Sequence, residues 1–311
     1  MLDAKKKSSY YAGMNKLPVA KRVQILSMLC EGVSMRSISR VADVSINTVS
    51  KLLVDAGTVC TAFHDAKVRG LKSKRVQCDE IWAFCYSKQR AVATAKAPPV
   101  GAGDVWTWTA LDSDSKLIIS WLVGQRNADC AIEFLGDVKD RIPERSSDRV
   151  QLTSDGLNSY IAAVEATLFD VDYAMLVKVY GEAPEAERRY SPPVCTGAHK
   201  RSIMGNPDPA HISTSHVERS NLQMRMSMRR FTRLTNAHSK KVANHCHALA
   251  IYFMYYNWIR IHSALRVTPA MASGLTDKLM SWEDVVALMD AREGAPKKRG
   301  HYKDKSRENS N

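Results

Sequence analysis

The 311-residue sequence predicts an α/β fold: a mixed five-stranded sheet with flanking helices, preceded by an all-α segment. Strand-like stretches rich in Val, Ile, Trp and Tyr occupy the middle of the chain, first three in succession and then alternating with helical stretches. The first sixty residues instead keep the apolar spacing of helices. With 45% hydrophobic residues, 15 Gly and 11 Pro, the composition excludes collagen-like, low-complexity and wholly disordered chains.

The N-terminal region, from Leu17 to Asp55, has helical spacing throughout. Pro18 suits a first helical turn, and Ser34 and Ser45 are each placed to cap a following helix. Two short helices joined by a tight turn are typical of a helix-turn-helix, whose second helix reads DNA. Its predicted DNA-binding residues are Ser45, Asn47, Thr48 and Lys51. A small helical bundle without DNA contacts is the alternative.

The central region predicts an antiparallel meander of three strands, followed by alternating helices and strands. The meander strands are residues 76–86, 104–111 and 116–124, with a Pro/Gly/Ala-rich loop between the first two. The elements that follow are a helix at 127–142, a strand at 149–154, a helix at 158–169 and a strand at 172–180. This order predicts a mixed sheet.

The last third opens with an irregular stretch, about 181–215, which holds five of the eleven prolines. Helical spacing returns at Ser215 and continues to about Ala264, with a break near 233–239. The basic end of the chain is expected to be disordered. The predicted organisation is a helix-turn-helix DNA-binding domain at 1–60, a basic linker at 61–75, an α/β domain at 76–275 that includes the irregular stretch, and a C-terminal helix with a tail at 276–311.

The cysteines and the most apolar stretch predict an intracellular location. The seven cysteines form no CxxC pair, as expected for reduced thiols. No secretory signal is visible at the N-terminus. The most apolar stretch, Cys246 to Ile259, is too short and too polar for a membrane span. We therefore expect a cytoplasmic protein without a membrane partner.

Positive charge is concentrated in one segment. The chain carries 45 Lys+Arg against 32 Asp+Glu, a formal +13. From Arg219 to Ser273 there are nine Lys/Arg and no Asp or Glu. A solvated surface normally mixes both signs, so this run favours phosphate binding over an ordinary exposed face.

Glu218 stands directly before this basic run. Helical geometry places it on one side with Arg225 and Arg229. Another side is apolar and can pack against the sheet; it comprises Val217, Met224, Met228 and Phe231. A carboxylate thus shares a face with phosphate-binding guanidinium groups. A simple intrahelical ion pair is the alternative.

Two aspartates lie at positions in the predicted sheet where a carboxylate could have a functional role. Asp79 lies inside the first strand, where a charge is costly unless it is paired or bound to metal. Asp155 follows the fourth strand, and Gly156 after it would permit an unusual backbone turn. An ordinary Asp-Gly turn is the structural alternative for Asp155.

Together these acids resemble a known arrangement. The motifs CDEIW, SDGLNSY and HVERSN, the last followed by R-x3-RR-x2-R, resemble those of DDE transposases, most closely the insertion-sequence-one type. YNWIRIHSAL and TPAM further on are similar to the closing motifs of bacterial insertion-sequence transposases. The resemblance spans about residues 76–270. It implies a ribonuclease-H-like fold with the first acid on the first strand, the second after the fourth strand and the third on a later helix.

The resemblance also implies a site and partners. Asp79, Asp155 and Glu218 would be the catalytic residues and the ligands of two Mg²⁺ or Mn²⁺ ions, which prefer hard oxygen donors. The partners would be double-stranded DNA, as element ends and target, and further copies of the chain in a synaptic complex in a bacterial nucleoid. The predicted DNA contacts of this domain are Arg219, Asn221, Arg225, Arg229, Arg230 and Arg233.

Some alternatives remain open. The loop at 87–103 and the 62 residues between Asp155 and Glu218 depart from the shortest family members, and Glu185 and Glu187 are alternatives for the third acid. The competing functions are a helix-turn-helix regulator on an inactive core and a nuclease without strand joining. A zinc site is disfavoured, because no common zinc module has the spacing of Cys195, His199, His211 and His216.

Overall fold

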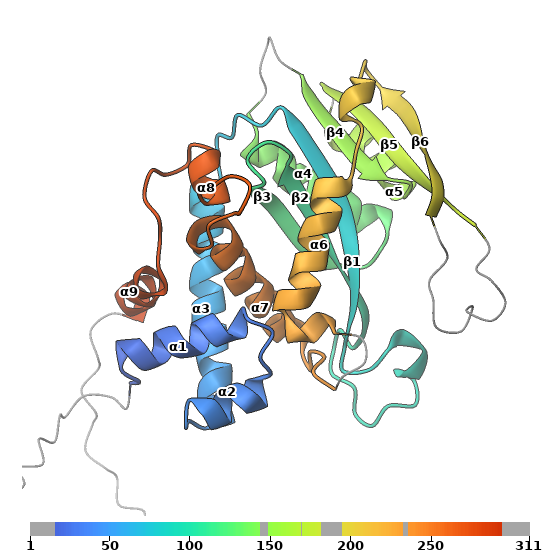
Figure 1. Cartoon of the computed structure of the whole chain (residues 1–311). Helices are drawn as coiled ribbons and strands as arrows, with labels where there is room; N and C mark the ends of the chain where they lie inside the picture. Colours follow the sequence, from blue (N-terminus) through green and yellow to red (C-terminus); the bar gives the residue numbers. More distant parts are fainter. Residues whose placement is uncertain (1–15, 144–148, 169, 182–194, 233–235, 294–311) are drawn as a thin grey trace, which may run out of the picture.

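A six-stranded mixed sheet forms the centre of the protein (Figure 1), in the order β3-β2-β1-β4-β5-β6. The computed structural model describes residues 16–143, 149–168, 170–181, 195–232 and 236–293. The strands are β1 (Arg75–Cys85), β2 (Gly103–Asp112), β3 (Ile118–Gly124), β4 (Val150–Asp155), β5 (Val171–Tyr180) and β6 (Cys195–Met204). The predicted meander is confirmed, and β4 pairs in parallel with both β1 and β5.

The sixth strand corrects the prediction of five. It forms inside the stretch that was expected to be irregular and pairs antiparallel with β5 along its length. Nearly all of β6 is exposed, and its sequence CTGAHKRSIM lacks alternating apolar residues. Backbone pairing with β5, rather than a buried face, therefore defines this edge strand, which explains why no sequence pattern indicated it.

Helices cover both faces of the sheet. On one face lie α4 (Ala128–Arg141) and α5 (Ser159–Thr167), close to the predicted bounds. Trp108 of β2 is fully buried there, with ring centroids 6.0 Å from Phe134 and 5.4 Å from Tyr160. The other face carries α6 (Ser215–Ser227), which lies across β1 (Figure 1). The fold is therefore a mixed α/β fold with helices on both faces of the sheet.

The predicted apolar side of α6 is confirmed: its four residues, which include Val217 and Phe231, are buried. The helix ends at Ser227, however, so the break begins earlier than expected. Arg229–Phe231 forms a separate 3₁₀ turn. Helical structure resumes as α7 (Val242–Met254), which continues into a π-helical turn at Tyr255–Ile259.

The N-terminal region contains three helices, α1 (Val19–Leu29), α2 (Met35–Val41) and α3 (Ile46–Lys67). Ser34 and Ser45 accept backbone hydrogen bonds at the starts of α2 and α3, as predicted. The helix α3 continues past residue 60 and packs along α7. Gly57 lies at this crossing, where an added β-carbon would be 2.5 Å from the β-carbon of His247. The absence of a side chain at Gly57 thus lets the helices approach closely.

The α3 and α7 layer is attached to the outer edge of the sheet. His64 contacts the Ile119 carbonyl oxygen at 2.9 Å. The Asn257 side chain accepts from Ile118 N at 3.0 Å and donates to Ile118 O at 2.9 Å, so it covers the free edge of β3. The chain then forms α8 (Pro269–Ala272) and α9 (Trp282–Glu293). None of the helices described is long and apolar enough to span a membrane.

Candidate active site

Two of the three predicted acids lie on neighbouring parallel strands. Asp79 is in the middle of β1, and Asp155 is the last residue of β4. Asp79 faces α6, because its register partner Thr109 and the α6 residue Asn221 lie on that side. Asn221 donates a hydrogen bond from Nδ2 to Asp79 Oδ2 at 2.7 Å. The third acid, Glu218, lies one helical turn before Asn221 on α6.

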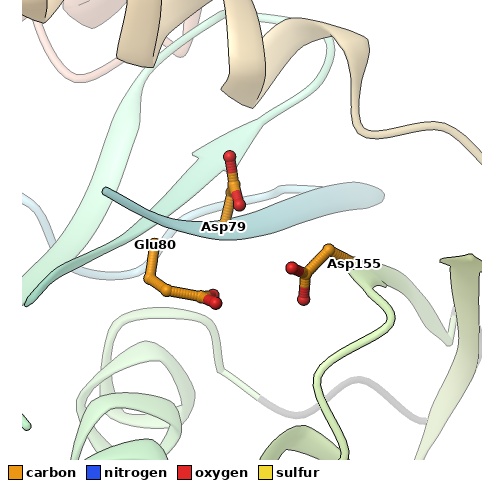
Figure 2. Close-up of side chains that lie close together, drawn as sticks. All are labelled: Asp79, Glu80 and Asp155. Carbon is orange, nitrogen blue, oxygen red and sulfur yellow. The ribbon is translucent and has the colours of Figure 1, made fainter. Parts of the chain in front are cut away.

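The structure brings Asp79 and Asp155 together with an acid that the sequence did not suggest. Among the described residues, Asp79, Glu80 and Asp155 form the one group whose potential metal-ligating oxygens all lie within 4.8 Å of one another. Figure 2 shows Asp79 and Glu80 leaving β1 on opposite sides, with Asp155 beside them. Three carboxylates at this separation are hard oxygen donors, so the cluster fits a divalent metal ion.

Glu80 is the site residue that sequence reasoning missed. Strand alternation turns it away from Asp79, and its side chain is 1% exposed. Arg126 donates from Nε to Glu80 Oε1 at 2.7 Å, and Tyr160 donates to Oε2 at 3.3 Å. The only signal in the sequence was the acidic pair Asp79-Glu80. The contact with Asp155 depends on how β4 ends, which that pair does not reveal.

Asp155 is held by the backbone that follows it. The Leu157 amide donates to Asp155 Oδ1 at 3.0 Å, and Arg126 Nη2 lies 3.6 Å from Oδ2. Arg126 therefore bridges Glu80 and Asp155. Gly156 does not use the backbone freedom that glycine permits: its φ is not positive, and a β-carbon there would meet Val177 at an ordinary 3.6 Å.

Glu218 lies outside the 4.8 Å cluster. Its Oε2 is 2.6 Å from Lys178 Nζ on β5, and Thr214 donates to its other oxygen. Its negative charge nevertheless contributes to raising the pKa of Asp155, so the two groups are within electrostatic range. The Lys178 ammonium group therefore compensates the negative charge of Glu218.

Burial raises the pKa of each of the three acids of the cluster. Desolvation, followed by repulsion from Glu80 and Asp155, raises the pKa of Asp79 to about 7, although the Asn221 hydrogen bond opposes this. Burial and the charge of Asp155 raise the pKa of Glu80 to about 6. Desolvation also raises the pKa of Asp155. The metal-free cluster thus holds more negative charge than its surroundings stabilise, which favours binding of a cation.

This pKa shift predicts a pH-dependent stability without metal. Asp79 titrates near 3.8 when unfolded and near 7 when folded, so the folded state binds more protons between these values. The contribution of Asp79 to stability is therefore lost as pH rises from about 4 to about 7. In EDTA, Asp79→Asn is expected to become increasingly stable relative to the wild type over this range. Urea unfolding at several pH values measures it; a pH-independent difference would contradict the shift.

The predicted DNA-binding residues have different surroundings. Asn221 is buried and bonded to Asp79, whereas Arg219, Arg225 and Arg229 are exposed. Arg230 is half-buried, and Arg233 lies outside the described residues, as do Glu185 and Glu187.

At the start of α3, Ser45 caps the helix and Asn47 is exposed. Thr48 and Lys51 line a different cavity from Asn47, and Lys51 pairs with Asp55. The residues of the disfavoured zinc set, Cys195 with three histidines, do not form a ligand group in the part of the chain described.

The fold and the site thus define an α/β protein with a partly buried acidic cluster suited to a divalent metal. No family model and no curated protein matches the sequence. A solved piggyBac transposase synaptic complex with hairpin DNA aligns over 89% of this chain and 72% of its own, with 11% identity and a TM-score of 0.39.

A Mos1 transposase paired-end complex with the left transposon end aligns over 51% of this chain and 60% of its own, with 14% identity and a TM-score of 0.21. The Mos1 strand transfer complex aligns over 49% and 56% respectively, with 18% identity and a TM-score of 0.20.

Proposed function

We propose that the protein is a DNA transposase of a bacterial insertion sequence that cuts and joins DNA with divalent metal ions. The observation that carries this proposal is the meeting of Asp79 and Asp155 at the adjacent strands β1 and β4, with Glu218 across from them on α6. This arrangement supports the proposal, because the resemblance implies acids on the first strand, after the fourth strand and on a later helix. The basic segment after Glu218 supplies positive charge for a polyanionic substrate.

Each residue of the site has a role in this proposal. Asp79 and Asp155 would hold the ions, and Asn221 would orient the Asp79 carboxylate through its hydrogen bond. Glu218 would complete the ligand set by exchanging its ion pair with Lys178 for the metal. Bound Mg²⁺ or Mn²⁺ supplies activation of the attacking oxygen and neutralisation of the leaving oxygen.

Glu80 has a supporting role in our proposal. Its carboxylate already has two partners, Arg126 and Tyr160, and it lies on the side of β1 opposite Asp79. Arg126 also packs over the Trp106 ring, 4.8 Å from its centroid, which helps fix the guanidinium group between Glu80 and Asp155. We therefore assign Glu80 and Arg126 to holding Asp155 in place, rather than to binding the ions.

The test of the function is cleavage and joining of DNA by the purified full-length protein. We expect Mg²⁺ or Mn²⁺ to support nicking of supercoiled plasmid, EDTA to abolish it, and the freed 3′ ends to be joined to a second labelled DNA. Nicking without joining would favour the nuclease alternative. DNA binding without any metal-dependent cleavage would favour a regulator on an inactive core.

A further inference from the structure

A second charged feature lies away from the acidic cluster, where the N-terminal helices meet the segment after α6. It is a groove of about 730 Å³. One wall comes from α2 and the start of α3 and includes Arg36, Asn47 and Ser50. The other wall comes from residues 228–230 and 236–248. The two walls are nearly two hundred residues apart in sequence, so this groove exists only in the folded chain; hereafter it is called the composite groove.

Direct contacts hold the two walls together. The Gly32 amide, in the turn before α2, donates to the Ser227 carbonyl oxygen at the end of α6, at 2.6 Å. Gly32 has a φ of +67°, and a β-carbon there would lie 2.9 Å from the Met226 carbonyl oxygen, so a glycine suits this junction. Arg230 also reaches the Met35 sulfur on α2. The groove is therefore a built feature with a defined width, rather than a gap between independent parts.

The charge of the composite groove is of one sign. Four cations line it, namely Arg36, Arg229, Arg230 and Lys240, and its lining, as described, contains no acidic residue. Like charges gathered without counterions are unfavourable; burial and, to a smaller extent, repulsion from Arg36 lower the pKa of Lys240. A groove of this kind is suited to an anionic partner.

Arg230 adds to the need for an anion, because its hydrogen-bond partners among the described residues, Ser239 and Met35, are neutral. It donates to Ser239 Oγ at 2.9 Å, and Ser239 is in turn 2.9 Å from His245 Nδ1. Burial lowers the pKa of His245 to about 3, so this ring is uncharged at neutral pH. Burial lowers the pKa of Arg230 to about 10, which leaves its guanidinium group charged. A half-buried charge among neutral groups is stabilised when an anion binds beside it.

We propose that the composite groove binds the phosphate backbone of a DNA duplex, with α2, the start of α3 and the side chains of Arg229, Arg230 and Lys240 contacting the same duplex. This inference rests on the proposed function and specifies how DNA is held outside the active site. A duplex fits better than a single free anion because the cations are distributed over both walls, whereas one phosphate contacts only a few groups. Asn47 and Ser50 add hydrogen-bonding side chains to the same wall.

The composite groove also indicates which residues at the start of α3 face the DNA. Asn47 and Ser50 line it, whereas Thr48 and Lys51 line a cavity on another side of the helix together with Asp55 and Glu293. In that second cavity the acids are paired with cations, Lys51 with Asp55 and Lys16 with Glu293, so these lysines are already neutralised, whereas the described lining of the composite groove holds no acid. The DNA-facing side of α3 is therefore the side of Asn47.

The salt dependence of DNA binding tests this proposal. The binding of a fluorescent random-sequence DNA duplex to the full-length protein is followed by anisotropy in EDTA, over a range of salt concentrations. Each lost phosphate contact reduces the slope of log K against log salt by about 0.9, so Arg36→Gln/Lys240→Gln should reduce it by about 1.8. The matched control, Lys67→Gln/Arg292→Gln, removes the same charge from exposed positions that do not line the groove. This control should keep the wild-type slope.

The outcomes separate this inference from the proposed function. Equal slopes for the two double variants would overturn the groove proposal, even if the protein cuts DNA. A reduced slope for the groove variant alone would support it, even if no cleavage is found. A groove variant that loses affinity for an RNA duplex but keeps its affinity for DNA would also overturn it. A Lys240→Arg variant, which keeps the charge, should retain the slope, which distinguishes phosphate binding from a folding defect.

Discussion

Replacing Asp79 by Asn is expected to lower metal-dependent DNA cleavage by more than about 100-fold, since losing even an outer-shell partner of a metal ligand costs 10–100-fold. Asp79 is the residue on which the cluster is centred: it lies beside Asp155 and Glu80 and accepts a hydrogen bond from Asn221. Asn has nearly the same shape as Asp but carries no negative charge. The substitution therefore removes a hard anionic ligand while leaving the packing against α6 in place.

Supercoiled-plasmid nicking with wild-type and variant protein, in Mg²⁺ and in Mn²⁺, measures this effect. Asp140→Asn is the matched control, because it makes the same chemical change at an exposed position near the end of α4. The control should cut DNA as the wild type does. Thermal unfolding adds a second readout, since Mn²⁺ should raise the melting temperature of the wild type more than that of Asp79→Asn. An Asp79→Asn protein that still cuts at the wild-type rate would refute the assigned site.

Gly57→Ala is expected to destabilise the protein by about 3 kcal/mol, at the upper end of what overpacked cores cost. The ideal β-carbon at this position would lie 2.5 Å from the His247 β-carbon and 2.6 Å from its α-carbon. Neither of these atoms belongs to a flexible side-chain end, so α3 and α7 would have to move apart. Such movement would disturb the layer through which His64 and Asn257 contact the edge strand β3.

Gly136→Ala is the control for this prediction. Gly136 also lies within a helix, α4, but a β-carbon there meets no atom within 4 Å. Alanine is favoured over glycine in a helix interior, so this variant should be more stable than the wild type by up to about 1 kcal/mol. Urea unfolding measures both free energies. If the two substitutions had the same sign, the close crossing of α3 and α7 would be wrong.

Local sequence patterns predicted most of the secondary structure. The strands of the meander, the alternation that follows, and the buried side of α6 agree with the structure because each depends on which neighbouring residues are apolar. The exposed strand β6 was not predicted, because it has no buried face to impose such a pattern and depends on pairing with β5. The early end of α6 at Ser227 was missed as well, since the apolar spacing continues into Phe231.

The sequence by itself determined the order of the elements other than β6, the strand or helix on which Asp79, Asp155 and Glu218 stand, and the basic run after Glu218. Only the tertiary structure decided which charged groups meet: Glu80 joins the aspartates, Lys178 pairs with Glu218, and Arg36 shares a groove with Lys240. The physical reason is that buried positions recur at a short, regular spacing along a strand or helix. The apolar residues of the sequence therefore show the same spacing. Contacts between distant charges depend instead on strand order and helix packing, which no local period encodes.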